Sequence, residues 1–134
     1  MTITEQIAKF LSSPAFAVAG ASTKWEKYGN MVVRCYQQQG KEVFPLHPLE
    51  KEIEGLPCVT TVAELPPSVK SLSMITPPQV TEKIVAAAIA HGIENIWMQP
   101  GAQSAVAVEL CRAQGVNVIA DGSCILVVLG FRGH

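Results

Sequence analysis

Residues 16–29 read FAVAGASTKWEKYG, and this stretch decides the fold class of the chain. The apolar run from Phe16 to Ala19 is typical of a buried strand, Gly20 ends it, and Gly29 opens a helical pattern. A strand, a glycine turn and a helix start in this order are typical of nucleotide-binding α/β domains. In such domains, loop N–H groups and the partial positive charge of the helix N-terminus bind a phosphate. We therefore expect a phosphate-binding loop directly after the first strand.

The second apolar strand, residues 43–46, argues against NAD as the ligand. It continues as Leu46-His47-Pro48, without the acidic residue that would bind the ribose 2′-OH of NAD at this point. An NADP-binding oxidoreductase or redox sensor stays open as an alternative, because NADP needs basic residues there and Lys51 is a candidate. The sequence thus favours a phosphate-bearing nucleotide and disfavours NAD.

The composition indicates a single domain, residues 1–134. Hydrophobic residues make up 49% of the chain and charged residues 16%, which is typical of an α/β protein with a fully covered sheet. A net charge of −1 argues against nucleic-acid binding, and no apolar segment reaches the length of a membrane span. The cysteines are far apart and none stands at metal-ligand spacing, so we expect reduced thiols in a cytoplasmic protein.

Short apolar strands alternate with amphipathic helices along the chain. Gly40, Gly92 and Gly115 each end a helix just before an expected strand. The expected helices cover residues 3–11, 29–39, 77–91 and 104–114, and the expected strands cover residues 16–20, 43–46, 72–76, 95–98 and 116–120, with a short extended piece at 58–59. This alternation predicts right-handed βαβ crossovers and an α/β fold: a three-layer, Rossmann-like, doubly wound sheet, mainly parallel, with about five strands and helices on both faces.

The helix after the third strand has the clearest start signal. Thr76 supplies a capping hydroxyl, Pro77 the first helical residue and Gln79 the N3 position. The buried stripe expected for this helix comprises Val80, Ile84, Val85, Ala88 and Ile89.

Several stretches, in order, resemble the CoA-binding domain family. They are AVAGAS at 17–22 with the later Gly29, the proline-flanked element at 45–48, GLPCVTTVAEL at 55–65, ITPP at 75–78 and WMQPG at 97–101, and they cover nearly the whole chain. The same Rossmann-like domain forms the N-terminal domain of the α subunit of succinyl-CoA synthetase. The chain is most similar to small, stand-alone CoA-binding proteins of bacteria. The resemblance implies that the ligand is coenzyme A or an acyl-CoA.

The resemblance also implies roles for residues beyond the strand ends, where parallel sheets bind their ligands. The pyrophosphate would lie on Gly20, Ala21, Ser22, Thr23, Lys24 and Gly29, the adenosine between Pro45, His47, Thr76, Pro77 and Pro78, and the pantetheine amides against Gln99. Lys24, Lys27 and Arg34 are candidate contacts for the pyrophosphate or for the 3′-phosphate of CoA.

No catalytic constellation is visible in the sequence. His91 is expected near a helix C-terminus, where a cation is favourable, and His134 is the last residue. Asp121 is the one acid expected near the ligand-binding edge of the sheet, and the nearby Cys124 is interpreted as a buried thiol. We therefore predict a binding module without a metal and without enzymatic turnover.

The apolar run at residues 125–129 bears on possible partners. A strand with one face in solvent would alternate, so we expect this run to form a strand buried within the monomer. The alternative is that it packs against a second copy or a partner enzyme. A protein-interaction subunit that has lost ligand binding is therefore a third interpretation of the chain.

Overall fold

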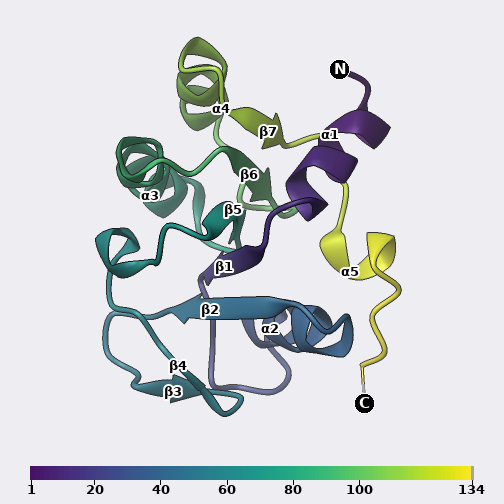
Figure 1. The fold of residues 1–134 in the computed structure, drawn as a ribbon, viewed down its shortest axis with the longest axis vertical. Helices are drawn as coiled ribbons and strands as arrows, with labels where there is room; N and C mark the ends of the chain where they lie inside the picture. The colour runs from purple at the N-terminus through teal and green to yellow at the C-terminus, as the bar shows by residue number, and fades with distance from the viewer. Residues whose placement is uncertain (134) are drawn as a thin grey trace.

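A computed structural model describes residues 1–133 of the protein, in which a five-stranded sheet lies between two layers of helices (Figure 1). The strands follow the order β2 (Glu42–Leu46), β1 (Ala15–Ala19), β5 (Val69–Met74), β6 (Asn95–Met98) and β7 (Asn117–Ile119). All neighbouring strands in this sheet are parallel. The predicted α/β fold, a three-layer Rossmann-like sheet, is confirmed.

Helices cover both faces of the sheet. On one face lie α1 (Ile3–Leu11), α2 (Tyr28–Gln38) and α5 (Ile125–Val128), and on the other lie α3 (Pro78–His91) and α4 (Ala105–Ala113) (Figure 1). Within residues 1–133 the longest helix is α3, with 14 residues, and no helix there combines the length and apolar character needed to cross a bilayer.

The central strand β1 separates two hydrophobic cores. Ala15, Ala17 and Ala19 pack into the core beneath α3 and α4, whereas Phe16 and Val18 pack into the core beneath α1 and α2. Successive side chains of a strand point to opposite faces, so a strand covered on both faces is apolar throughout. This explains the uninterrupted apolar run that begins the fold-deciding stretch.

The third parallel strand begins and ends earlier than predicted. β5 covers Val69–Met74 rather than residues 72–76, so Ile75 and Thr76 belong to the loop that follows it. The N–H of Ile75 still donates to the carbonyl of Ala19 at 2.9 Å. This bond holds the loop against the end of β1, where the site is built.

Helix α3 starts one residue later than predicted. Pro77 is its N-cap, with φ −59° and ψ 149°, and Pro78 is its first residue. The ring of Pro78 excludes the residue before it from the helical region, so Pro77 cannot begin the helix. The predicted capping role of Thr76 is therefore wrong, and its hydroxyl lies 2.7 Å from that of Thr81 instead.

The buried face of α3, formed by Thr81, Val85 and Ala88, differs in part from the predicted one. Val85 and Ala88 lie in the core as expected, and Ile84 and Ile89 pack against it. Val80, however, is 40% exposed, so its predicted burial is wrong.

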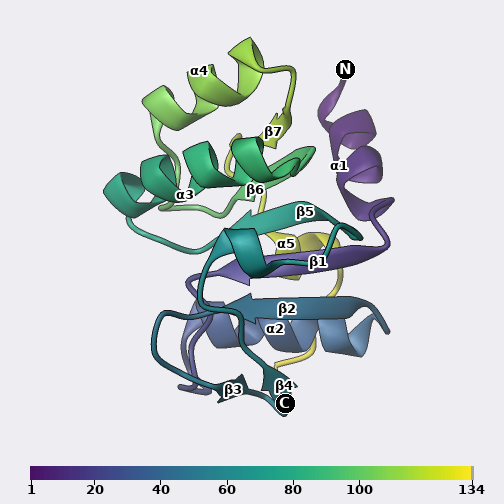
Figure 2. The same ribbon diagram turned by 60° about the vertical axis from the view of Figure 1, so that its left-hand side comes forward.

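The segment between β2 and β5 contains a hairpin that was not predicted from the sequence. β3 (Glu52–Ile53) and β4 (Leu56–Pro57) pair antiparallel, and Figure 2 shows them at the bottom of the view, below β2 and α2. Their two-residue turn has positive φ at both Glu54 and Gly55, as a type I′ hairpin turn requires. The expected extended piece at 58–59 is confirmed, because Val59 forms a parallel bridge with Leu46. A 3₁₀ helix, Val62–Glu64, follows.

The apolar run near the C-terminus is a helix, so the predicted strand is wrong. In α5, Ile125 is fully buried, whereas Val127 is 79% exposed. A helix of this sequence places Ile125 and Leu129 on one face, and both pack into the core beneath α1 and α2. Helical phase thus resolves the run into one buried and one exposed side.

Candidate functional site

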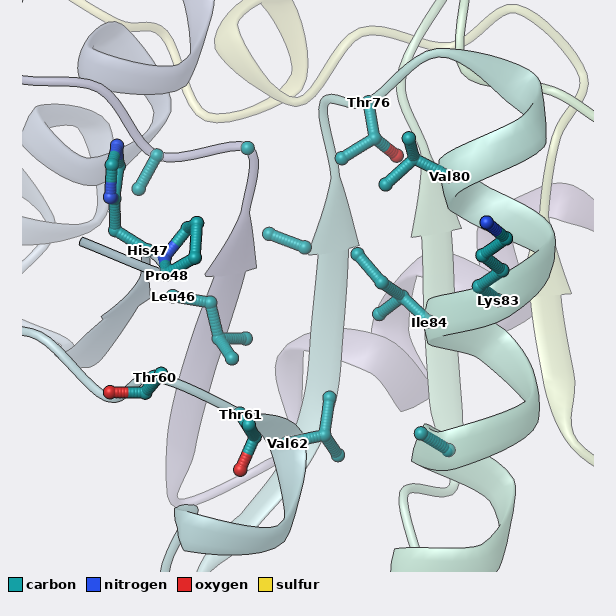
Figure 3. Close-up of a pocket in the computed structure, with 14 residues that line it drawn as sticks. Leu46, His47, Pro48, Thr60, Thr61, Val62, Thr76, Val80, Lys83 and Ile84 are labelled. Atoms are coloured by element: carbon teal, nitrogen blue, oxygen red, sulfur yellow. The ribbon is translucent and has the colours of Figure 1, made fainter.

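A cavity of about 500 Å³ lies beyond the C-terminal ends of β2, β1 and β5 (Figure 3). β1 pairs with β2 on one side and with β5 on the other, so the strand order reverses direction at β1. Open parallel sheets bind their ligands at such a topological switch point. We call it the main cavity, and it is lined by Ala19, Gly20, Ala21, Leu46, His47, Pro48, Thr60, Thr61, Val62, Thr76, Val80, Lys83, Ile84 and Ala87.

Gly20 allows the backbone to close around this cavity. Its φ is 85°, and a Cβ atom there would lie 2.0 Å from the carbonyl oxygen of Ile75. Only glycine combines this conformation with so close an approach of two backbone segments. Gly29, in the first turn of α2, packs in the same way against Gly20. The two glycines therefore place the N-terminus of α2 directly beside the end of β1.

Asn30 and Arg34 of α2 hold the loop between β1 and α2. The Asn30 amide donates to the carbonyl of Ser22 at 2.9 Å and to the Glu54 carboxylate at 3.0 Å. Arg34 donates through Nε to Asn30 Oδ1 at 2.6 Å and through Nη2 to the carbonyl of Trp25 at 2.6 Å. Two loop carbonyls are thus bound by buried side chains of α2.

The loop N–H groups remain available. Among residues 1–133, no hydrogen bond takes up the N–H groups of Ala21, Ser22 or Thr23. The N-cap of α2, Lys27, makes no side-chain cap, and the first turn carries no acidic residue. Free N–H groups beside an uncapped helix N-terminus form an environment suited to an anion.

Arg34 lies inside the protein, where it cannot reach a ligand phosphate as was expected from the sequence. Only 5% of the residue is exposed, and its guanidinium stacks 3.4 Å above the ring of Trp25. The ring of Phe131 lies 5.3 Å from the same group. The Arg34 side chain therefore lies beneath the loop, whereas Lys24 and Lys27 are exposed on the loop itself.

Of the predicted site residues, Gly20, Ala21, His47 and Thr76 line the main cavity. Ser22, Thr23, Lys24 and Gly29 belong to the adjoining loop and helix start, Pro45 is buried within β2, and Pro77 and Pro78 begin α3. The structure therefore gathers most of the predicted residues around one edge of the sheet.

His47 shapes the rim of the cavity. Its Nδ1 accepts hydrogen bonds from the N–H groups of Leu49 at 3.0 Å and Glu50 at 2.9 Å. The ring therefore stabilises the turn after β2, and it stands on the side of the cavity away from α3 (Figure 3).

Gln99 lies apart from the main cavity, in a second recess. Its Oε1 accepts from the N–H of Ile125 at 2.8 Å, and its Nε2 lies 3.4 Å from the sulfur of Cys124. This far recess measures about 340 Å³ and is lined by Tyr28, Ile75, Gln99, Pro100 and Cys124.

A middle recess shares lining residues with both. It measures about 260 Å³ and shares Thr76 with the main cavity and Ile75 and Pro100 with the far recess. Pro77 also lines it. The three hollows therefore follow one another along the C-terminal edge of the sheet.

Two walls of the main cavity were not predicted from the sequence. Thr60, Thr61 and Val62 come from the segment around the 3₁₀ helix, and Val80, Lys83, Ile84 and Ala87 come from α3. The α3 residues recur at helical spacing, and this pattern could have shown that they share one face of the helix. The sequence prediction had instead assigned Val80 and Ile84 to the buried stripe of the helix.

The residues considered for catalysis are engaged elsewhere. The Asp121 carboxylate accepts from the N–H of Ser123 at 3.0 Å, and hydrogen bonding to Ser123 lowers the pKa of that carboxyl. His91 Nε2 lies 2.9 Å from the carbonyl oxygen of Leu65. Cys124, which was expected to be buried, is only partly buried and lines the far recess, whereas burial raises the pKa of Cys35 and Cys111 to about 11. His134 lies outside the described residues, and residues 1–133 contain no cluster of three potential metal ligands.

Comparison with known protein families agrees with this geometry. Residues 14–130 match the model of the CoA binding domain family. The chain belongs to that family. The resemblance found in the sequence is therefore confirmed across nearly the whole chain.

Relatives of this CoA-binding domain occur both alone and within larger proteins. A conserved hypothetical protein from Pyrococcus furiosus is 36% identical, with a TM-score of 0.81 over 85% of this chain and 97% of the other. A protein from Thermus thermophilus is 24% identical and shares the fold, with a TM-score of 0.85 over 95% of this chain and 96% of the other. An ADP-forming acetate–CoA ligase from Archaeoglobus fulgidus is 25% identical over 113 residues, and the match spans only 16% of its length.

Proposed function

We propose that this protein binds coenzyme A or an acyl-CoA along the C-terminal edge of its sheet and acts as a binding module without turnover. The observation that carries the proposal is the main cavity at the switch point, bordered by a loop with free N–H groups in a CoA-binding family member. A phosphate-bearing nucleotide needs both an apolar slot and an anion site, and these features would supply them.

The pyrophosphate would lie against residues 20–24 and the N-terminus of α2. The free N–H groups of Ala21, Ser22 and Thr23 would donate to its oxygens. Asn30 and Arg34 keep the loop in place, so little ordering would be required when the ligand binds. Lys24 is exposed on the same loop and would add charge.

The adenosine would occupy the main cavity. Leu46 from β2, Val62 from the 3₁₀ segment and Ile84 from α3 direct apolar side chains into it (Figure 3). Such walls suit the faces of a purine ring, and the volume of about 500 Å³ is within the range of small-molecule sites.

The pantetheine arm would follow the middle recess towards the far recess. Pro77 would form an apolar wall, and Pro78 would hold it by starting α3. Both polar atoms of the Gln99 amide already have partners, so Gln99 would shape the far recess, with Cys124 at its end.

Two observations support a role in binding alone. Within residues 1–133, no nucleophile, base and orienting group come together as catalysis would require. The match covers 97% of the Pyrococcus furiosus chain, so a related protein consists almost entirely of this domain.

Titration calorimetry with CoA, acetyl-CoA, NAD and NADP tests the proposal. Ala87 and Ala86 are adjacent, exposed alanines of α3, but only Ala87 lines the main cavity. We expect CoA to bind more tightly than NAD, and Ala87→Trp to weaken CoA by at least about tenfold, or about 1.4 kcal/mol. Ala86→Trp should leave the affinity unchanged. NAD binding without CoA binding, or equal effects of the two variants, would overturn the proposal.

A further inference from the structure

Lys83 is the one lysine or arginine among the residues that line the main cavity. Its side chain rises from α3, across the cavity from Leu46 and His47 (Figure 3). The other residues on the α3 wall, Val80, Ile84 and Ala87, are apolar. A cationic group therefore stands at the edge of an otherwise uncharged wall.

Nothing in residues 1–133 neutralises this cation. The ion pairs there join Lys70 to Glu94 and Arg112 to Glu109, and none involves Lys83. The positions three and four residues away along α3 are Gln79, Val80, Ala86 and Ala87, none of which is acidic. The adjacent Glu82 is engaged on another side of the helix, where its carboxylate accepts from the Ser104 hydroxyl at 2.6 Å.

Lys83 and the anion site at residues 20–24 come from different elements around the cavity. That site belongs to the loop between β1 and α2, whereas Lys83 belongs to α3, the helix that follows β5 in the sequence. A ligand that spans the cavity from the loop to α3 would thus meet two places suited to negative charge. With the pyrophosphate assigned to the free N–H groups of the loop, Lys83 is left for a second phosphate group.

We propose that Lys83 recognises a phosphate monoester on the ribose of the bound nucleotide, and so selects 3′-phosphorylated ligands over their dephosphorylated forms. This inference rests on the proposed function, because it takes the adenosine to lie in the main cavity. A phosphate monoester carries a charge near −2 at neutral pH, and a lysine ammonium binds phosphate as a compact point charge. The same chemistry is offered by the 3′-phosphate of CoA and the 2′-phosphate of NADP.

The experiment compares CoA with 3′-dephospho-CoA, and NADP with NAD, on the wild-type protein, Lys83→Gln and Lys83→Arg. Lys9→Gln, on α1 at the opposite face of the sheet, is the control, and thermal unfolding confirms that every variant folds. We expect the wild type to prefer CoA by roughly tenfold or more, as a charged hydrogen bond would give. Lys83→Gln should abolish that preference by weakening CoA alone, and Lys83→Arg should restore much of it.

The outcomes separate the two proposals. Equal affinity of the wild type for CoA and dephospho-CoA, or an equal loss of both in Lys83→Gln, overturns the role of Lys83 and leaves CoA binding intact. Failure of the wild type to bind either form of CoA, together with NADP binding that depends on Lys83, supports the monoester site and overturns CoA as the ligand. Failure to bind any of the four nucleotides overturns both proposals.

Discussion

Gly29 packs against the carbonyl group of Gly20 so closely that a Cβ atom on Gly29 would lie 1.9 Å from that oxygen. The first turn of α2 therefore rests directly on the turn that ends β1. The two glycines of the fold-deciding stretch are required by backbone packing, and the same packing brings the helix N-terminus to the main cavity.

Gly29→Ala should destabilise the protein, although alanine in a helix is ordinarily the better residue by about 0.5–1 kcal/mol. The added methyl group would force the helix away from Gly20, at a cost of about 1–3 kcal/mol. Urea unfolding measures this as a lower midpoint at unchanged slope.

Gly115→Ala is the comparison for that experiment. Gly115 has a φ of 71°, but a Cβ atom there would meet no other atom within 4 Å, so only the backbone conformation opposes alanine, at about 1–2 kcal/mol. CoA affinity should fall in Gly29→Ala and stay unchanged in Gly115→Ala. A Gly29→Ala protein as stable as the wild type would contradict the role of this contact.

Arg34→Met should loosen the loop between β1 and α2. The substitution leaves Asn30 Oδ1 and the carbonyl of Trp25 without their donor, which costs about 1–3 kcal/mol. Nη1 of Arg34 has no partner among residues 1–133, so the loss should fall in the lower half of that range. Trp25 should become more accessible to acrylamide quenching, because the guanidinium no longer stacks on its ring.

Arg112→Met is the matched control for Arg34→Met. Arg112 makes an exposed ion pair with Glu109 at 3.6 Å, and such pairs contribute less than about 1 kcal/mol. Its stability and quenching should match those of the wild type. Equal behaviour of the two variants would show that Arg34 does not hold the loop.

Acetyl-CoA should protect Cys124 from alkylation. The thiol lines the far recess, where the proposed path of the pantetheine arm ends. Cys35 and Cys111 are buried, and burial raises the pKa of each to about 11, but Cys58 is partly buried like Cys124, so iodoacetamide labelling is followed on the Cys124 peptide by mass spectrometry. Acetyl-CoA is used because it has no free thiol, and NAD serves as the control nucleotide. An unchanged labelling rate at saturating acetyl-CoA would place the arm elsewhere.

The C-terminal helix should respond to substitution on one side only. Ile125 is fully buried, so Ile125→Ala should cost about 2–5 kcal/mol of stability. Val127 is 79% exposed, so Val127→Asp should change the stability by less than about 0.5 kcal/mol. Thermal unfolding and size-exclusion chromatography check both. A wild-type dimer that Val127→Asp converts to a monomer would instead make α5 an interface.

The sequence by itself determined the order of the elements and many of their ends, because these depend on local chemistry. The strand expected at 95–98 is β6 without correction, and Gly92 ends α3 with a φ of 99°. An apolar run, a capping residue and a glycine each determine the backbone structure of residues only a few positions away in the sequence. The glycine loop and the strand ends that border the site could be located for the same reason.

Only the tertiary structure decided which distant residues share the cavity. Thr61 and Lys83 line it from separate segments, whereas Arg34 turns inward and Gln99 lines a different recess. The run at 125–129 folds as a helix against α2 and not as a further strand of the sheet. These outcomes depend on helix phase and on packing across the sheet. The direction of a side chain depends on what its helix packs against, as Val80 shows by lining the cavity instead of the core, and no local pattern contains that information.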